Sequence, residues 1–242
     1  MMDLISIIRS ILIFLHLDLN KGLEYDRLTK IIMKKIITPE SNCIDVGCHK
    51  GEILNQILKS SPNGLHFAFE PIPHLFNQLQ HKFPKTVKIF PYALSDNNGV
   101  TTFNYVKNAP SYSGLKKRTY EIEKPDIEEI NVEMKRLDDC VPQELKIQFI
   151  KIDVEGGELG VLKGAKRIIM QSKPFILFEC GIGASDYYGT TSKDIFSFIN
   201  NDNSMDIFLL TSWIRNGTAL TEEQFHHYFT TNKEYYFLAC SQ

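Results

Sequence analysis

The sequence predicts an α/β domain in which helices cover both faces of a mostly parallel sheet. Short apolar runs of strand length alternate along the chain with segments whose apolar residues recur at helical spacing. Charged residues stand at the ends of several of these runs, and a glycine loop follows the first of them. Because ligands of open α/β sheets bind outside the carboxyl ends of the strands, the pattern also indicates where a site is expected.

The N-terminal third is expected to form successive β-α-β units. Leu28, Ile32 and Ile36 recur at helical spacing, and Pro39 ends that helix. The elements that follow are a strand over 42–46, a helix over 51–61, a strand over 66–70, a helix over 75–83 and a strand over 87–90. Crossovers of this length join parallel strands through right-handed connections. The three strands are therefore expected to lie in one parallel sheet.

The middle of the chain leaves this pattern. Asp96-Asn97-Asn98-Gly99 signals a tight turn before a strand over 100–105. Residues 106–129 carry no periodicity, and a loop of this length in a compact domain is usually a binding segment or disordered. Its basic run, Lys116-Lys117-Arg118, is interpreted either as a solvated face or as a clamp for an acidic or phosphorylated substrate.

The second half returns to alternating strands and helices. Its expected elements are strands over 131–136 and 146–153, a helix over 158–170, a strand over 174–180, a helix over 192–200, and apolar runs at 206–210 and 235–240. This order completes a sheet with helices on both faces.

Composition agrees with one compact domain. The chain has 242 residues, of which 43% are hydrophobic, and this is enough to bury a full core. A formal net charge of −2 and the absence of a basic stripe argue against a nucleic-acid partner. The five cysteines include no C-x-x-C pair, which argues against a disulfide framework or a zinc knuckle and favours a cytoplasmic location.

The first residues form a separate feature. Residues 4–19 are strongly apolar, although Arg9 interrupts them, and this run is shorter than the ~20 residues that a membrane-spanning helix needs. It is interpreted as a helix docked on the core or on a protein partner, or as a peripheral membrane contact. We therefore expect an N-terminal helical segment over 1–38 and one folded domain over 39–242.

A glycine loop and a later carboxylate predict a nucleoside-cofactor site. Asp45 lies just before the loop from Gly47 to Gly51, and Glu70 ends the next strand. The loop lets backbone N–H groups approach a ligand, and Glu70 can accept both hydroxyls of a ribose. The glycine spacing does not match the dinucleotide fingerprint, which disfavours a nicotinamide oxidoreductase. Asp45 suits a ligand with a positive end, such as S-adenosylmethionine; the alternative is a plain strand-to-helix turn.

More charged residues follow two later strands. Lys151 and Asp153 share one face of their strand, and Glu155 and Glu179 stand at strand ends. Unpaired charges in a buried strand are costly, so these groups are expected to be paired or to face a cleft. Lys151 is interpreted as a structural ion pair or a substrate contact, and Asp153 is expected to point into the crevice. A carboxylate cluster of this kind also permits a divalent metal, such as Mg²⁺, which is not favoured.

These motifs together resemble one enzyme family. In chain order they are Ile44-Asp45-Val46-Gly47, Phe69-Glu70-Pro71, Ala93-Leu94-Ser95, Leu137-Asp138 and Lys151-Ile152-Asp153-Val154-Glu155-Gly156-Gly157-Glu158. The set is similar to the FkbM family of S-adenosylmethionine-dependent methyltransferases. The resemblance implies a Rossmann-like class I methyltransferase with seven strands, the last antiparallel. It also implies O-methylation of a sugar, a glycan or a polyketide-type metabolite.

The resemblance also assigns roles to residues. It implies that the cofactor is bound at its methionine end by Asp45, Gly47 and Gly51, at its ribose by Glu70, beside its adenine by Ser95 and Asp96, and near its methyl group by Asp153. The base that takes the hydroxyl proton is expected to be Asp153 first, Glu155 second and Glu179 third. The alternative function is a non-catalytic S-adenosylmethionine-binding or scaffold protein of a biosynthetic assembly. The oligomeric state is left open.

Overall fold

The computed structural model describes residues 21–241, and the expectations for residues 4–19 lie outside that range. The helix expected over 23–36 is confirmed as α2 (Lys21–Ile36). Its buried side chains share one hydrophobic cluster with residues of four strands. α2 therefore packs directly on the sheet, while the division of the chain at residues 38 and 39 stays a prediction.

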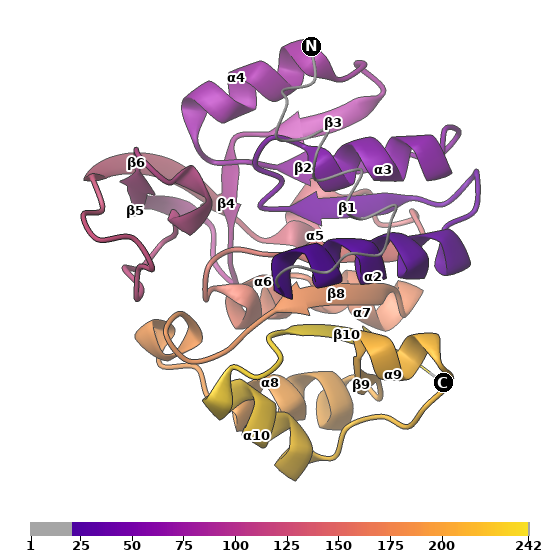
Figure 1. Cartoon of the computed structure of the whole chain (residues 1–242). Helices are drawn as coiled ribbons and strands as arrows, with labels where there is room; N and C mark the ends of the chain where they lie inside the picture. Colours follow the sequence, from indigo (N-terminus) through magenta and orange to yellow (C-terminus); the bar gives the residue numbers. More distant parts are fainter. Residues whose placement is uncertain (1–20, 242) are drawn as a thin grey trace.

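A seven-stranded, mostly parallel sheet forms the centre of the fold, as expected (Figure 1). In spatial order its strands are β3 (Val87–Phe90), β2 (His66–Phe69), β1 (Cys43–Val46), β7 (Phe149–Ile152), β8 (Phe175–Glu179), β10 (Tyr236–Cys240) and β9 (Asp206–Leu209). Strand β10 runs antiparallel to both of its neighbours. Every residue of β1, β2 and β7 is buried, because helices cover both faces of these strands.

Helices cover the two faces of the sheet in two groups. One face carries α2, α3 (Glu52–Ser60), α4 (Pro73–Lys82) and α9 (Leu210–Ile214). The other carries α5 (Leu137–Cys140), α6 (Glu158–Gly164), α7 (Lys166–Ser172), α8 (Ser192–Phe196) and α10 (Glu222–Thr231). Successive strand residues point to opposite faces, so Cys43 belongs to the first core and Ile44 to the second. None of the helices within residues 21–241 is long and apolar enough to cross a membrane.

A second, three-stranded sheet lies beside the carboxyl ends of the parallel strands (Figure 1). It consists of β4 (Tyr92–Leu94), β6 (Ile127–Lys135) and β5 (Gly99–Val106), in that spatial order. The sequence predicts parts of β5 and β6 but not this sheet. Strand β6 starts earlier than expected because it pairs with β5 along its whole length, from Gly99 opposite Met134 to Val106 opposite Ile127. The expected long loop is thereby reduced to residues 107–126, which we call the strap; it contains a 3-10 turn, Pro110–Tyr112.

Two expected helices differ from the prediction. The helix over 158–170 is divided into α6 and α7 at Ala165. The division has a local cause, because the Asp138 carboxylate accepts hydrogen bonds from the N–H groups of Arg167 and Ile168 and so caps a new helix start. The helix over 192–200 begins as α8 and continues as the wider helical segment Ser197–Asp202. A second 3-10 turn, Ser185–Tyr188, follows β8.

Candidate active site

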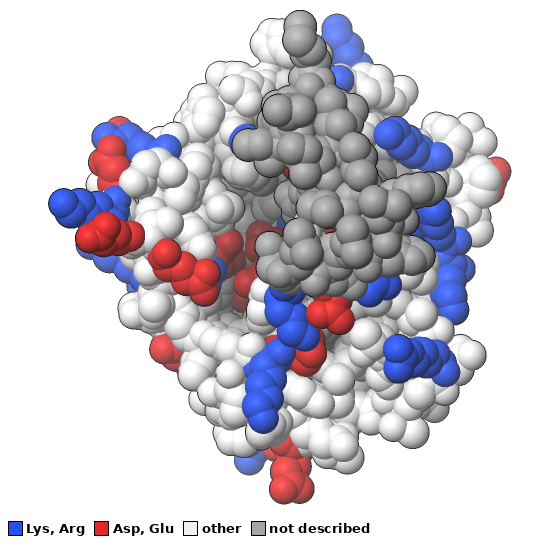
Figure 2. Space-filling model, in the orientation of Figure 1, with Lys and Arg blue, Asp and Glu red and all other residues white. Residues whose placement is uncertain are grey.

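A cavity of about 1490 Å³ opens at the carboxyl ends of the parallel strands. The residues of the predicted site that line it are Asp45, Gly47, Glu70, Asp153, Glu155 and Glu179. Figure 2 shows acidic side chains at the bottom of a hollow on this face. The clustering that the sequence predicts from strand ends is therefore present.

The two glycines of the first loop have different roles. Gly47 has a φ of 71°, and a Cβ on it would collide with the backbone oxygen of Asp153. Gly47 thus lets the ends of β1 and β7 approach each other. Gly51 has a φ of 73°, but a Cβ there would meet the ring of Phe83 at 2.5 Å. Gly51 supports packing between α3 and α4, and the structure does not bring it to the cavity wall.

Glu70 connects the end of β2 to the glycine loop. Its Oε2 accepts a 2.8 Å hydrogen bond from the N–H of His49, and its Oε1 accepts a 2.9 Å bond from the N–H of Ile72. Glu70 is 3% exposed, and this burial raises the pKa of its carboxyl to about 7. A carboxylate oxygen can accept more than one hydrogen bond, so Glu70 keeps acceptor capacity for hydroxyl groups of a ligand.

Asp45 and Lys151 lie side by side below the glycine loop. Asp45 is fully buried, neither of its carboxylate oxygens has a hydrogen-bonding partner among residues 21–241, and burial raises the pKa of this carboxyl to about 6. The Nζ of Lys151 lies 3.9 Å from Asp45 Oδ1 and 3.2 Å from Asp153 Oδ2, and donates a 3.1 Å hydrogen bond to the carbonyl of Gly47. Burial lowers the pKa of Lys151, but the negative charges of Asp153 and Asp45 together outweigh this effect. The pKa of Lys151 is therefore raised above its ordinary value. Of the two interpretations of Lys151, the structure favours the ion pair.

Asp153 is held from two sides at the end of β7. Besides the contact with Lys151, its Oδ2 accepts a 2.8 Å hydrogen bond from the hydroxyl of Tyr236 on β10. The side chain of Asp153 is still 24% exposed and lines the cavity. Asp153 therefore presents a fixed carboxylate to the cavity, as its place at a strand tip predicts.

Glu158 is a site residue that the sequence analysis did not assign. Its Oε1 accepts hydrogen bonds from the N–H groups of Val154 (3.0 Å) and Gly156 (3.1 Å), so it fixes the turn that follows β7. Glu155 and Gly156 in this turn have positive φ values of 59° and 104°. Glu158 is 1% exposed and lines the cavity, and burial raises its pKa to about 7. The signal was present in the sequence, because an acidic residue directly after two glycines is suited to hold a turn at a helix start.

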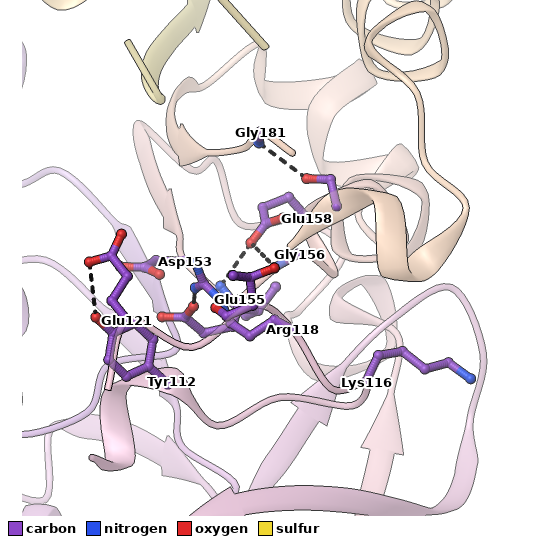
Figure 3. Close-up of polar contacts among 12 residues, drawn as sticks. Tyr112, Lys116, Arg118, Glu121, Asp153, Glu155, Gly156, Glu158 and Gly181 are labelled. Carbon is purple, nitrogen blue, oxygen red and sulfur yellow. Dashed lines mark hydrogen bonds and ion pairs between the residues drawn. The ribbon is translucent and has the colours of Figure 1, made fainter. Parts of the chain in front are cut away.

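The strap reaches over the cavity and brings a cation into it. Arg118 forms an ion pair with Glu155 and lies over the ring of Tyr112, 5.3 Å from its centroid. Backbone N–H groups of the strap donate to the opposite wall: that of Thr119 to Gly183 O (2.8 Å) and that of Lys116 to Tyr188 Oη (3.1 Å). In Figure 3, Arg118 points toward the carboxylates, whereas the side chain of Lys116 points away from them.

Glu179 stands at the end of β8, on the same side of the cavity as Arg118. Burial, and then the negative charges of Asp153 and Glu158, raise the pKa of its carboxyl to about 8. Within the described part of the chain, this carboxylate has no hydrogen-bonding partner. Glu155, by contrast, is paired with Arg118. The three predicted base candidates thus lie in one cavity but differ in how they are held.

Ser95 and Asp96 lie elsewhere. They line a separate cavity of about 360 Å³, together with Gly160 and Thr190. The preceding residues Ala93 and Leu94 line the main cavity instead. Among residues 21–241, no three or more His, Cys, Asp and Glu side chains are grouped so that they could hold a metal ion.

The known proteins that this chain resembles are methyltransferases. Residues 45–204 match the family described as Methyltransferase FkbM domain. Methyltransferase sdnD of Sordaria araneosa is 28% identical over an alignment of 152 residues. The match covers 50% of this chain and 59% of that protein. The chain thus spans less than two thirds of this curated relative.

Two solved structures show the same fold. The methyltransferase FkbM of Methylobacillus flagellatus has a TM-score of 0.52 at 17% identity, covering 84% of this chain and 44% of that one. A putative rRNA-methylase of Clostridium thermocellum has a TM-score of 0.50 at 9% identity, covering 88% and 91%. At these identities the likeness is one of architecture, and it supports the Rossmann-like arrangement described above.

Proposed function

The chain belongs to the FkbM family of methyltransferases, and we propose on that basis that it transfers the methyl group of S-adenosylmethionine to a hydroxyl oxygen of a sugar, a glycan or a related small metabolite. One observation carries this proposal. Asp45 and Glu70 lie on one wall of the same cavity that Asp153 enters from the end of β7. A donor and an acceptor bound there would meet at the tip of β7.

The residues on the first wall fit a cofactor with a ribose and a positive end. Glu70 has acceptor capacity left for two hydroxyls, and its two backbone contacts fix its orientation. The carboxylate oxygens of the buried Asp45 accept no hydrogen bond from any of residues 21–241, which suits a cationic group of a ligand. When bound, S-adenosylmethionine supplies a methyl group on a sulfonium that already has a good leaving group. Gly47 takes part by letting the loop close on Asp153, and Gly51, Ser95 and Asp96 are outside this wall.

Asp153 is the proposed proton acceptor. As the acceptor oxygen takes the methyl group, its proton passes to Asp153 and S-adenosylhomocysteine is released. Contacts with Lys151 and Tyr236 fix the carboxylate before the reaction. Fixed alignment of two reactants can lower a barrier by roughly 7–11 kcal/mol, while a general base adds about 10²–10⁴-fold. Positioning is therefore expected to contribute the larger part of the rate.

Calorimetry and a transfer assay test the proposal. The protein is titrated with S-adenosylhomocysteine and with NAD, and is then incubated with S-adenosylmethionine and a panel of hydroxylated sugars. Micromolar binding of S-adenosylhomocysteine alone, with methyl ethers formed on an acceptor, is the expected result. Binding without transfer to any acceptor would favour the non-catalytic alternative. No binding of S-adenosylhomocysteine would refute the cofactor assignment.

A further inference from the structure

Among residues 21–241, carboxylates outnumber cations on the acceptor side of the cavity, around the ends of β7 and β8. The cations there are Arg118 and Lys151, and each already contacts a carboxylate, Glu155 and Asp153 respectively. The lysines that line the cavity elsewhere belong to α2, α3, α4 and the glycine loop. Two carboxylates on this side, Glu158 and Glu179, therefore have no cation of the described chain in contact with them.

Glu158 gives the clearest sign of a missing partner. Its Oε1 is satisfied by two backbone N–H groups, but its Oε2 has no hydrogen-bonding partner within residues 21–241. The residue is 1% exposed and lines the cavity. Buried polar atoms in folded proteins are almost always hydrogen-bonded, because an unpaired one is costly. A ligand donor that reaches Oε2 would remove this cost.

Glu179 ends β8, the neighbour of β7, and Glu158 begins the helix after the turn that follows β7, so both carboxylates lie at the same edge of the sheet and line the same cavity. Within the described residues, the Glu179 carboxylate also accepts no hydrogen bond. Two neighbouring acceptors of like charge suit a ligand group that is both a multiple donor and a cation. An ammonium group has three N–H donors and one positive charge, which matches this pair.

Aromatic rings complete the same part of the cavity. Tyr112, Tyr235 and Tyr236 line it, and Tyr236 is the direct neighbour of Glu179 across the β8–β10 ladder. Aromatic faces attract cations, as the ring of Tyr112 already does with Arg118. The rings and the two carboxylates therefore favour the same kind of ligand.

We propose that the acceptor of methyl transfer carries a protonated amine, which binds between Glu158 and Glu179 while a hydroxyl of the same molecule faces Asp153. This inference rests on the proposed function and narrows its substrate class to amine-bearing acceptors, such as amino sugars. The ammonium group donates hydrogen bonds to Glu158 Oε2 and to the Glu179 carboxylate. It also supplies a positive charge beside two carboxylates that no cation of residues 21–241 contacts.

Matched pairs of sugars test the inference without relying on turnover. The protein, saturated with S-adenosylhomocysteine, is titrated with glucosamine and galactosamine and with their N-acetyl forms at the highest pH at which the sugar amine is still protonated, because the raised pKa values of Glu158 and Glu179 leave these carboxyls neutral at lower pH. Each pair keeps the ring hydroxyls, and acetylation removes the positive charge on nitrogen and adds an acetyl group. We expect the amine to bind at least about tenfold more tightly than its acetylated partner. Equal affinity within the pairs, a preference for the neutral sugar, or binding of neither form would overturn the inference.

Three variants locate the effect. Glu179→Gln is expected to remove the preference for the amine, and Glu123→Gln, on the exposed part of the strap outside the cavity lining, is expected to keep it. Glu158→Gln retains an oxygen for the Val154 and Gly156 bonds but loses the charge, so it decides the question if Glu179→Gln does not fold. A preference that survives in both cavity variants would refute the assignment. Absence of S-adenosylhomocysteine binding in the unmodified protein would refute the proposed function, whereas intact binding without amine preference refutes this inference alone.

Discussion

The hydroxyl of Tyr236 donates a 2.8 Å hydrogen bond to Asp153 Oδ2 and thereby joins the end of the antiparallel strand β10 to the tip of β7. Tyr236 is also the register partner of Glu179 on β8, the strand that lies between β7 and β10. One side chain from the far end of the chain thus adjoins two carboxylates of the cavity. The Asp153 carboxylate is held from the other side by Lys151.

Replacing Tyr236 with Phe tests whether this contact positions Asp153. The variant keeps the half-buried ring and loses only the hydrogen bond to the carboxylate. A hydrogen bond to a charged group contributes about 1.5–3 kcal/mol, so kcat is expected to fall about tenfold or more. The affinity for S-adenosylhomocysteine, measured by calorimetry, is expected to change little. Tyr228→Phe on α10, outside the cavity lining, is the control, and an equal loss of kcat in both variants would point to a general structural effect.

Asp153→Asn tests the proposed proton acceptor. Asparagine has nearly the same shape but cannot take a proton, so the variant is expected to bind S-adenosylhomocysteine and to lose most methyl transfer. A general base contributes about 10²–10⁴-fold, which sets the size of the expected loss in a single-turnover assay. An unimpaired single-turnover rate would move the base to Glu179, which is the next carboxylate without a partner, because Glu155 is paired with Arg118.

Glu70→Ala tests the cofactor wall. The variant removes the acceptor for ribose hydroxyls and also frees the N–H groups of His49 and Ile72. The affinity for S-adenosylhomocysteine is expected to fall at least about tenfold, measured by titration calorimetry. Glu70→Gln, which keeps one acceptor oxygen, is expected to lie between the variant and the unmodified protein. Unchanged affinity in Glu70→Ala would refute the assignment.

The strand ends were predictable from the sequence because they have a local signature. Asp45, Glu70 and Asp153 each interrupt or end an apolar run, and a parallel sheet brings such ends to one edge. The contacts that complete the site have no such signature. Tyr236 reaches Asp153 and Arg118 reaches Glu155 across distant parts of the chain, and nothing in the spacing of these residues predicts either pair.

The second sheet was missed for a different physical reason. Most residues of β5 and β6 are exposed or half-buried, with Val100 at 72% exposure and Val132 as the buried residue of β6. An alternating apolar pattern arises when one face of a strand is buried, so these strands lack the signal that identifies a core strand. Ser95 and Asp96 directly follow β4, the third strand of this sheet, and they line the smaller cavity.

The buried carboxyls predict how stability depends on pH. Burial raises the pKa of Glu70 and Glu158 to about 7 and that of Glu179 to about 8, each from an ordinary value of 4.5. Between the ordinary pKa and the raised pKa, these three carboxyls bind more protons in the folded state than in the unfolded state. Their contribution to stability is therefore fully present below the ordinary pKa and is lost as pH rises through the raised pKa. In urea denaturation of the ligand-free protein, the free energy of unfolding is expected to fall by more than about 1 kcal/mol between pH ~5 and ~8.

Glu179→Gln shows whether these groups cause the trend. Glutamine imitates the protonated carboxyl, so the variant is expected to lose less stability over the same pH range than the unmodified protein. Glu123→Gln, which is exposed, is expected to keep the full dependence. A free energy of unfolding that rises with pH in the unmodified protein would contradict the assignment of raised pKa values.

Gly47→Ala tests the close approach of β1 and β7 that brings the two walls of the cavity together. Gly47 has a φ of 71°, and Gly189 has nearly the same φ of 70°. A Cβ on Gly47 would collide with the backbone oxygen of Asp153, whereas a Cβ on Gly189 would meet no atom of the described chain within 4 Å.

Both substitutions introduce the strain of an L-residue at positive φ, which costs of order 1–3 kcal/mol, but Gly47→Ala also separates the strand tips. We therefore expect Gly189→Ala to lower the free energy of unfolding alone, and Gly47→Ala to lower it further and to weaken S-adenosylhomocysteine binding at least about tenfold. Equal effects of the two substitutions on stability and on binding would show that the approach of Gly47 to Asp153 does not shape the cavity.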